Sequence, residues 1–175
     1  RHVRPRFTFY GFRYMKVEGI DAVDPSQFTA CVIHSDIRRT GRLVTSNDKI
    51  NRLILNSEWG QRGNFVDVPT DCPQRDERMG WTGDAQVYCA TASFNRYTPA
   101  FYHKFLYDML LEQNELSGDV PFVVPDVLNR VYLKRGEAKE HANCGSCAWA
   151  DAATVIPWTL YEFYGDVSLL AQHYP

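Results

Sequence analysis

The chain has 175 residues, which is enough for one domain with a hydrophobic core, and it contains 45% hydrophobic and 23% charged residues, as globular proteins do. The formal net charge is −2 and no block of lysines and arginines occurs, which argues against nucleic acid and anionic membranes as partners. No apolar run approaches the ~20 residues that would span a bilayer.

Residues 5–34 predict β structure. Residues 7–10, 12–17 and 28–34 are rich in aromatic and β-branched side chains, and glycines and an Asp-Pro-Ser turn separate them. Residues 35–45 are then expected to form a linker. The chain does not begin with Met and stops within a helical pattern, so we expect it to be an excerpt of a longer polypeptide.

From about residue 46 the hydrophobic spacing becomes that of helices. Ser46 is the predicted N-cap of a first helix, which should end near Gly60 or Gly63. A second helix is expected to begin at Thr82 or Gly83, after a charged loop. We therefore expect the charged loop to connect the end of the first helix to the start of the second.

The third helix has the clearest signals in the chain. Thr98 can cap it, Pro99 suits its first position, and Gly118 should end it. The following residues, 119–148, contain prolines and glycines and are expected to be irregular, apart from a short apolar piece near 127–133.

A fourth helix is predicted at about residues 151–163, and a fifth begins near Val167. Pro157 lies inside the fourth, where it should kink the helix or move its start. The chain is therefore expected to be mainly α, with long loops that carry acids and tryptophans. That pattern favours a helical barrel with its site at the loop end.

The five cysteines leave at least one thiol unpaired within the chain. Cys144 and Cys147 form a CxxC pair, which occurs in zinc sites and in redox pairs. His141 is nearby, but no second pair of ligands follows. A loop with incidental thiols is the favoured interpretation.

The segment at residues 69–84, PTDCPQRDERMGWTGD, holds four carboxylates, two arginines and one tryptophan. An exposed loop of salt bridges would explain the charges alone. Trp81 favours a binding site, because an indole in a loop needs either a core or a ligand face. Carboxylates beside an aromatic face are what a glycosidase subsite requires.

Cleavage of a glycosidic bond with inversion requires two carboxyl groups ~6.5–9.5 Å apart, one of them protonated. If the loop brings Glu77 close to Asp71 and Asp84, repulsion favours a proton on one of the three. The positive charges of Arg75 and Arg78 oppose that protonation.

The segment 69–84 resembles the signature of the bacterial and fungal α-L-rhamnosidases, large inverting enzymes that cleave terminal rhamnose. Three further stretches are similar to parts of that family: residues 10–14 (YGFRY), 64–71 (NFVDVPTD) and 148–153 (AWADAA). In the last of these, Ala150 stands where the family usually has glycine. The resemblance implies a partial (α/α)6 barrel at residues 41–175, preceded at residues 1–40 by the end of a β-sandwich domain and a linker.

By that resemblance Glu77 matches the general acid, and Trp81 matches an aromatic wall of the sugar subsite. Trp149 matches a second wall, although a core indole at a helix start is the alternative. The residues that match holders of the sugar hydroxyls are Asp71, Arg75 and Asp84. Four other acids are interpreted as surface or structural residues: Glu58, Asp67, Asp76 and Asp108.

In the family the general base is a glutamate in a later loop, which this chain does not contain. The implied partners are a rhamnose-containing glycoside or polysaccharide and the rest of the same polypeptide's barrel, with no cofactor and no metal. Without the remaining helices, exposed apolar surface is expected. Two alternatives remain, a helical-barrel glycosidase for another sugar and a non-catalytic carbohydrate-binding module.

Overall fold

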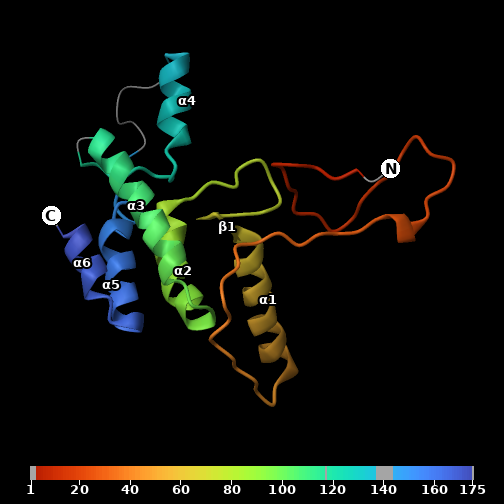
Figure 1. Cartoon of the computed structure of the whole chain (residues 1–175), viewed down its shortest axis with the longest axis horizontal. Helices are drawn as coiled ribbons and strands as arrows, with labels where there is room; N and C mark the ends of the chain where they lie inside the picture. Colours follow the sequence, from red (N-terminus) through yellow and green to blue (C-terminus); the bar gives the residue numbers. More distant parts are fainter. Residues whose placement is uncertain (1–2, 117, 137–143, 175) are drawn as a thin grey trace.

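The computed structural model describes residues 3–116, 118–136 and 144–174, and these are mainly helical. A short hairpin of strands β1 and β2 precedes α2, and a 3₁₀ turn, η1, lies near the N-terminus (Figure 1). The bounds are η1 Pro25–Gln27, α1 Asp48–Asn64, β1 Phe65–Val66, β2 Val68–Pro69, α2 Thr82–Asn95, α3 Pro99–Glu115, α4 Val127–Arg135, α5 Ala152–Tyr164 and α6 Val167–His173. No helix in these described ranges has the length and hydrophobicity needed to cross a membrane.

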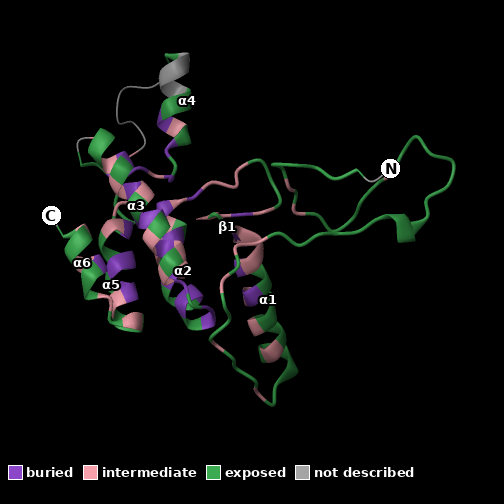
Figure 2. Ribbon diagram, in the orientation of Figure 1, coloured by how far each residue is buried: buried purple, intermediate pink, exposed green. Residues whose placement is uncertain are grey.

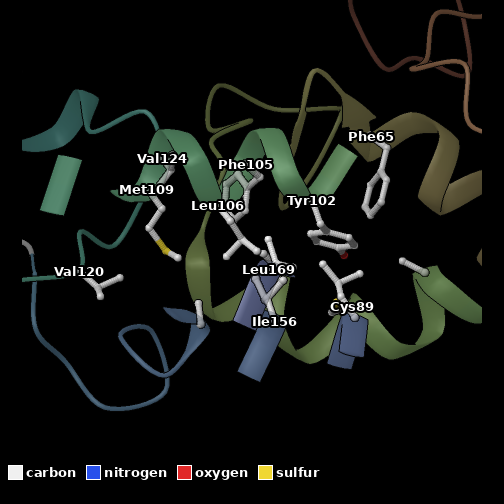
Figure 3. Close-up of a cluster of buried hydrophobic side chains, with 14 residues drawn as sticks. Phe65, Cys89, Tyr102, Phe105, Leu106, Met109, Val120, Val124, Ile156 and Leu169 are labelled. Atoms are coloured by element: carbon white, nitrogen blue, oxygen red, sulfur yellow. The ribbon is translucent and has the colours of Figure 1, made fainter. Parts of the chain in front are cut away.

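Helix α5 packs against α2, α3 and α6, and the buried apolar side chains lie among these helices (Figure 3). Phe65 extends this core to the hairpin, because its ring stacks on Phe101 at 4.4 Å and meets Tyr102 edge-on at 6.0 Å. The loop that follows the hairpin is thereby fixed to the core at its N-terminal end. The helices predicted from hydrophobic spacing are confirmed by the observed bounds.

The helix ends follow local chemistry, with one correction. Asn47 rather than Ser46 caps α1, since its side chain accepts hydrogen bonds from the amides of Lys49 and Ile50. Thr98 precedes Pro99 at the start of α3 as predicted, but its hydroxyl bonds the hydroxyls of Ser93 and Tyr164 instead of capping the helix.

Helix α5 ends at Tyr164, and Gly165 after it has a left-handed φ of 68°, as a glycine after a helix allows. The helix starts at Ala152 and continues through Pro157. The sequence predicted that Pro157 would either kink the helix or displace its start. The start of the helix is not displaced to Pro157. Helix α6 begins at Val167, as expected.

The strands predicted at residues 7–10, 12–17 and 28–34 are absent from the structure. The described residues 3–34 form an extended, mostly exposed segment in which the 3₁₀ turn is the one named element (Figures 1 and 2). A strand needs a neighbour for its backbone hydrogen bonds, and residues 3–34 have no partner strand among the described residues. Local β propensity therefore produced extended backbone without a sheet.

The expected apolar surface is present. Buried residues concentrate in α2, α3 and α5, whereas α1 is largely exposed (Figure 2). On α1, Leu53 is 67% exposed, and on α5 Trp158 is 53% exposed. Both helices thus keep an apolar face that nothing in the described structure covers.

Candidate functional site

The loop between β2 and α2 is closed by Asp71 and Met79. The amide of Asp71 donates to the carbonyl oxygen of Met79 at 3.3 Å, and the amide of Met79 donates to Asp71 Oδ1 at 3.1 Å. The side chain of Asp71 is only 7% exposed. Asp71 therefore shapes the loop as well as facing the site.

Arg75 joins the two acids that the sequence singled out in this loop. Its Nε donates to Glu77 Oε2 at 2.7 Å, and its Nη2 lies 3.5 Å from Asp71 Oδ2. The hydrogen bond to Glu77 is the main cause of the raised pKa of Arg75. The structure thus brings together three predicted site residues, with the Glu77 side chain 32% exposed.

Among the described residues, one group of side chains has metal-ligand geometry. The oxygens of Asp71 and Glu77 and the Sγ of Cys72 lie within 4.8 Å of one another. Burial raises the pKa of the Cys72 thiol, so the thiolate that a metal needs is disfavoured. Arg75 bonds both carboxylates, so the cation at this cluster is a guanidinium.

The end of the loop pairs with residues 121–124. Gly80 accepts a hydrogen bond from the Val124 amide at 2.9 Å, and Thr82 donates its amide to the carbonyl of Phe122 at 2.9 Å. A Cβ on Gly80 would overlap the Val124 carbonyl oxygen, so this close approach requires glycine. The pairing fixes Trp81 and the start of α2.

Asp84 lies in the first turn of α2, as predicted. The partial loss of hydration raises the pKa of its carboxyl, and the negative charges of Asp71 and Glu77 add to the effect. The loop thus places a third carboxyl within electrostatic reach of the first two. One turn further along α2, the Tyr88 hydroxyl lies 3.2 Å from the Ser57 hydroxyl of α1.

Trp81 and Trp149 lie on the wall of one pocket with Glu77. This pocket has a volume of about 560 Å³, and its other lining residues are Asp76, Met79, Phe122 and Leu128. Trp149 also borders a second pocket of about 570 Å³ that includes Asp71, Asp84 and Tyr88. Trp149 is therefore a half-buried wall shared by two hollows, and its role in a sugar subsite stays a prediction.

The indole of Trp149 is held against the start of α2. A Cβ on Gly83 would lie 3.2 Å from its ring, and the ring of Phe122 is 5.7 Å away. The preceding residue, Ala148, has a left-handed φ of 68°. Its carbonyl accepts from Gln86 Nε2, and its amide donates to Asp151 Oδ2 at 3.0 Å. These bonds fix the turn that presents Trp149.

The acids interpreted as structural make contacts away from the pockets, with one exception. Glu58 pairs with Arg39, and Lys104 bridges Asp67 at 3.1 Å and Asp108 at 2.9 Å. Asp76 differs, because it borders the pocket with Glu77 while its side chain is fully exposed.

The CxxC motif lies in the loop before Trp149. Cys144 donates to Asp119 at 3.6 Å, and burial together with the negative charge of Asp119 raises its pKa to about 11. A thiol with so high a pKa is a poor nucleophile, which disfavours redox chemistry. All five cysteines lie in the described residues and none is in a disulfide, whereas His141 lies outside those residues.

Sequence reasoning missed several residues that line the pockets. Tyr88 follows Asp84 by four residues, so helical spacing could have placed it on the same face of α2. Phe122 and Leu128 come from a segment expected to be largely irregular, and no local signal links them to the loop.

The family model for the bacterial alpha-L-rhamnosidase six-hairpin glycosidase domain matches residues 38–175, and the model for the concanavalin-like domain of the same proteins matches residues 1–34. An alpha-L-rhamnosidase of Formosa agariphila is 43% identical over 173 residues, which are 97% of this chain and 17% of that protein. One from Alteromonas is 40% identical over 98% of this chain and 18% of its own length.

The solved structures that this chain matches are also alpha-L-rhamnosidases. The alpha-L-rhamnosidase of Aspergillus terreus matches 87% of this chain and 16% of its own, with a TM-score of 0.72 and 40% identity. That of Streptomyces avermitilis, solved in complex with L-rhamnose, matches 80% of this chain and 12% of its own, with a TM-score of 0.68 and 37% identity. The chain spans about a sixth of the length of its curated relatives.

Proposed function

This chain belongs to the bacterial α-L-rhamnosidase family, and we propose that it is the first part of a helical-barrel catalytic domain that hydrolyses terminal α-L-rhamnosyl groups with inversion. The observation that carries the proposal is the hydrogen-bonded set of Asp71, Arg75 and Glu77. Glu77 from this set shares a pocket with Trp81 and Trp149.

Glu77 is the proposed general acid. Two carboxyls line the pocket with the indoles, and Asp76 is the other. Water surrounds the fully exposed carboxyl of Asp76, whereas two thirds of the Glu77 side chain is shielded. A proton donor has to be held in a fixed position beside the bond that it protonates, and Arg75 provides that support for Glu77.

Arg75 can support Glu77 through the proton transfer. It bonds Glu77 at 2.7 Å, so it stabilises the carboxylate that remains after the proton has been donated. Its second contact, with Asp71 at 3.5 Å, lets the guanidinium stay bound when Glu77 carries a proton.

Asp71, Arg75 and Asp84 are the proposed holders of the sugar hydroxyls. Carboxylates accept from hydroxyl groups and the guanidinium donates to them, so together they define an orientation for the ring. Trp81 and Trp149 would cover the apolar edge of rhamnose, including its methyl group, as indole faces do for apolar ligand surfaces.

The second carboxylate of the mechanism is proposed to come from a later loop of the same polypeptide, ~6.5–9.5 Å from Glu77 across the sugar. We place the domain boundary near residue 40, with residues 1–40 belonging to the preceding β domain and linker. The exposed apolar faces of α1 and α5 would be covered by further helices of the barrel.

The test uses the complete polypeptide that contains this chain and a panel of p-nitrophenyl glycosides. We expect preferential cleavage of the α-L-rhamnoside, with the β anomer of rhamnose seen first by proton NMR. Preferential cleavage of another glycoside would identify a barrel glycosidase for another sugar. Rhamnose binding without cleavage of any glycoside would indicate a carbohydrate-binding module, and the chain of residues 1–175 alone should cleave none.

A further inference from the structure

Arg78 directly follows Glu77, and its side chain is anchored on the N-terminal segment. Its Nη1 donates to the carbonyl oxygen of Phe9 at 2.6 Å, across 69 positions of sequence. The guanidinium also lies over the rings of Phe9 and Tyr10, at 5.5 and 5.8 Å from their centroids. Residues outside the helical domain therefore hold the neighbour of the proposed acid.

A second contact joins the same two segments at the other end of the turn. The amide of Gly11 donates to the carbonyl oxygen of Pro73 at 2.9 Å. A Cβ on Gly11 would lie 2.6 Å from that oxygen and 2.8 Å from its carbon, so no larger residue fits without moving the backbone. The turn that carries Arg75 and Glu77 is thus held at Pro73 and at Arg78.

The backbone of the turn is in an unusual conformation at Arg78. Its φ is 49°, in the left-handed region that non-glycine residues seldom adopt. Its amide also contacts the Cys72 thiol, while the next residue, Met79, bonds Asp71. Glu77 therefore lies inside the loop that the Asp71–Met79 bonds close, directly before the residue that is fixed to the N-terminal segment.

We propose that Arg78 and Gly11 are positioning residues that set the direction of the Glu77 carboxyl by docking the loop on residues 9–11. The inference rests on the proposed function, since it concerns the same acid. It makes the segment before the helical domain part of the catalytic apparatus, although neither Arg78 nor Gly11 lines either pocket.

The proposal makes a specific kinetic prediction. A misdirected acid harms departure of a leaving group that needs a proton, and it matters little for one that leaves as a stable anion. In the complete polypeptide, Arg78→Lys and Gly11→Ala should lower kcat for an alkyl α-L-rhamnoside by about 10- to 100-fold, as misplacement of about 1 Å does. For 2,4-dinitrophenyl α-L-rhamnoside the loss should be under about 3-fold, with KM changed little for both substrates.

Arg38→Lys is the matched control, because Arg38 lies over the Tyr97 ring at 5.4 Å, away from the loop. It should leave both activities unchanged. Phe9→Leu keeps the carbonyl acceptor and removes one ring, so it should give a smaller version of the Arg78→Lys effect while sparing the fold.

Equal losses for both leaving groups in Arg78→Lys, Gly11→Ala and Phe9→Leu would overturn the inference, because a purely structural role lowers the amount of active enzyme and harms both substrates alike. Unchanged activity in all three would overturn it as well. A wild-type protein that cleaves neither rhamnoside would instead refute the proposed function, so the two failures are distinguishable.

Discussion

Replacement of Gly83 by alanine tests whether the start of α2 sets the position of Trp149. The added Cβ would lie 3.2, 3.2 and 3.3 Å from three atoms of the indole, whereas ordinary carbon contacts are ~3.5–4.0 Å. The ring must therefore retreat by about 0.3–0.5 Å. Because Trp149 borders both pockets, either direction of retreat changes the fit of a sugar.

The expected loss is one of affinity rather than of stability. A gap of that size forfeits up to about a quarter of the dispersion attraction at one wall, so we expect L-rhamnose to bind up to about 10-fold more weakly. Alanine favours the helix over glycine by up to about 1 kcal/mol, which offsets the strain, so the free energy of unfolding should change by less than about 1 kcal/mol.

Titration calorimetry with L-rhamnose and urea unfolding of the complete polypeptide measure the two quantities. Gly60→Ala in α1 is the control for helix propensity, since a Cβ there meets no atom within 4 Å, and it should stabilise by up to about 1 kcal/mol. A Gly83→Ala protein with unchanged affinity and the full stability gain of Gly60→Ala would refute the reasoning.

Two further predictions follow from perturbed pKa values. Folding raises the pKa of Asp84, so the unfolded chain loses this proton at a lower pH than the folded protein does. The charged carboxyl therefore costs stability at neutral pH. Asp84→Asn should raise Tm at pH 7, and the gain should shrink as the pH falls toward about 4. A gain that persists at pH 4 would contradict this. Burial raises the pKa of Cys89 to about 12, so a disulfide reagent at pH 8 should label the exposed Cys147 quickly and Cys89 only after denaturation. Rapid labelling of Cys89 in the native protein would show that the α2 core is open.

The helices could be predicted from sequence because their signals are local. Pro99 and Gly165 mark helix ends through their own backbone preferences, so α3 begins at the predicted residue and α5 ends within one residue of the predicted end. The N-terminal strands could not, because a strand depends on a partner that residues 3–34 lack among the described residues. The choice of Asn47 over Ser46 as a cap is a difference of one position between two good capping residues.

The residues of the candidate site could be proposed from the sequence, but only some of the contacts between them could be. Asp71, Arg75 and Glu77 are close in sequence, so their ion pairs follow from one tight loop. The contact of Trp149 with Gly83 joins segments 66 positions apart, and the contact of Arg78 with Phe9 joins segments 69 apart. Such contacts depend on how elements pack, and single residues do not encode them.

The replacement of Glu77 by glutamine in the complete polypeptide tests the central claim most directly. Glutamine keeps the shape and can still bond Arg75 through its carbonyl oxygen, but it has no acidic proton to donate. Release of rhamnose from an alkyl α-L-rhamnoside, whose leaving group needs a proton, should fall by about 10²- to 10⁴-fold, with L-rhamnose still bound. Near-normal turnover by the variant would contradict the assignment of Glu77 as the general acid.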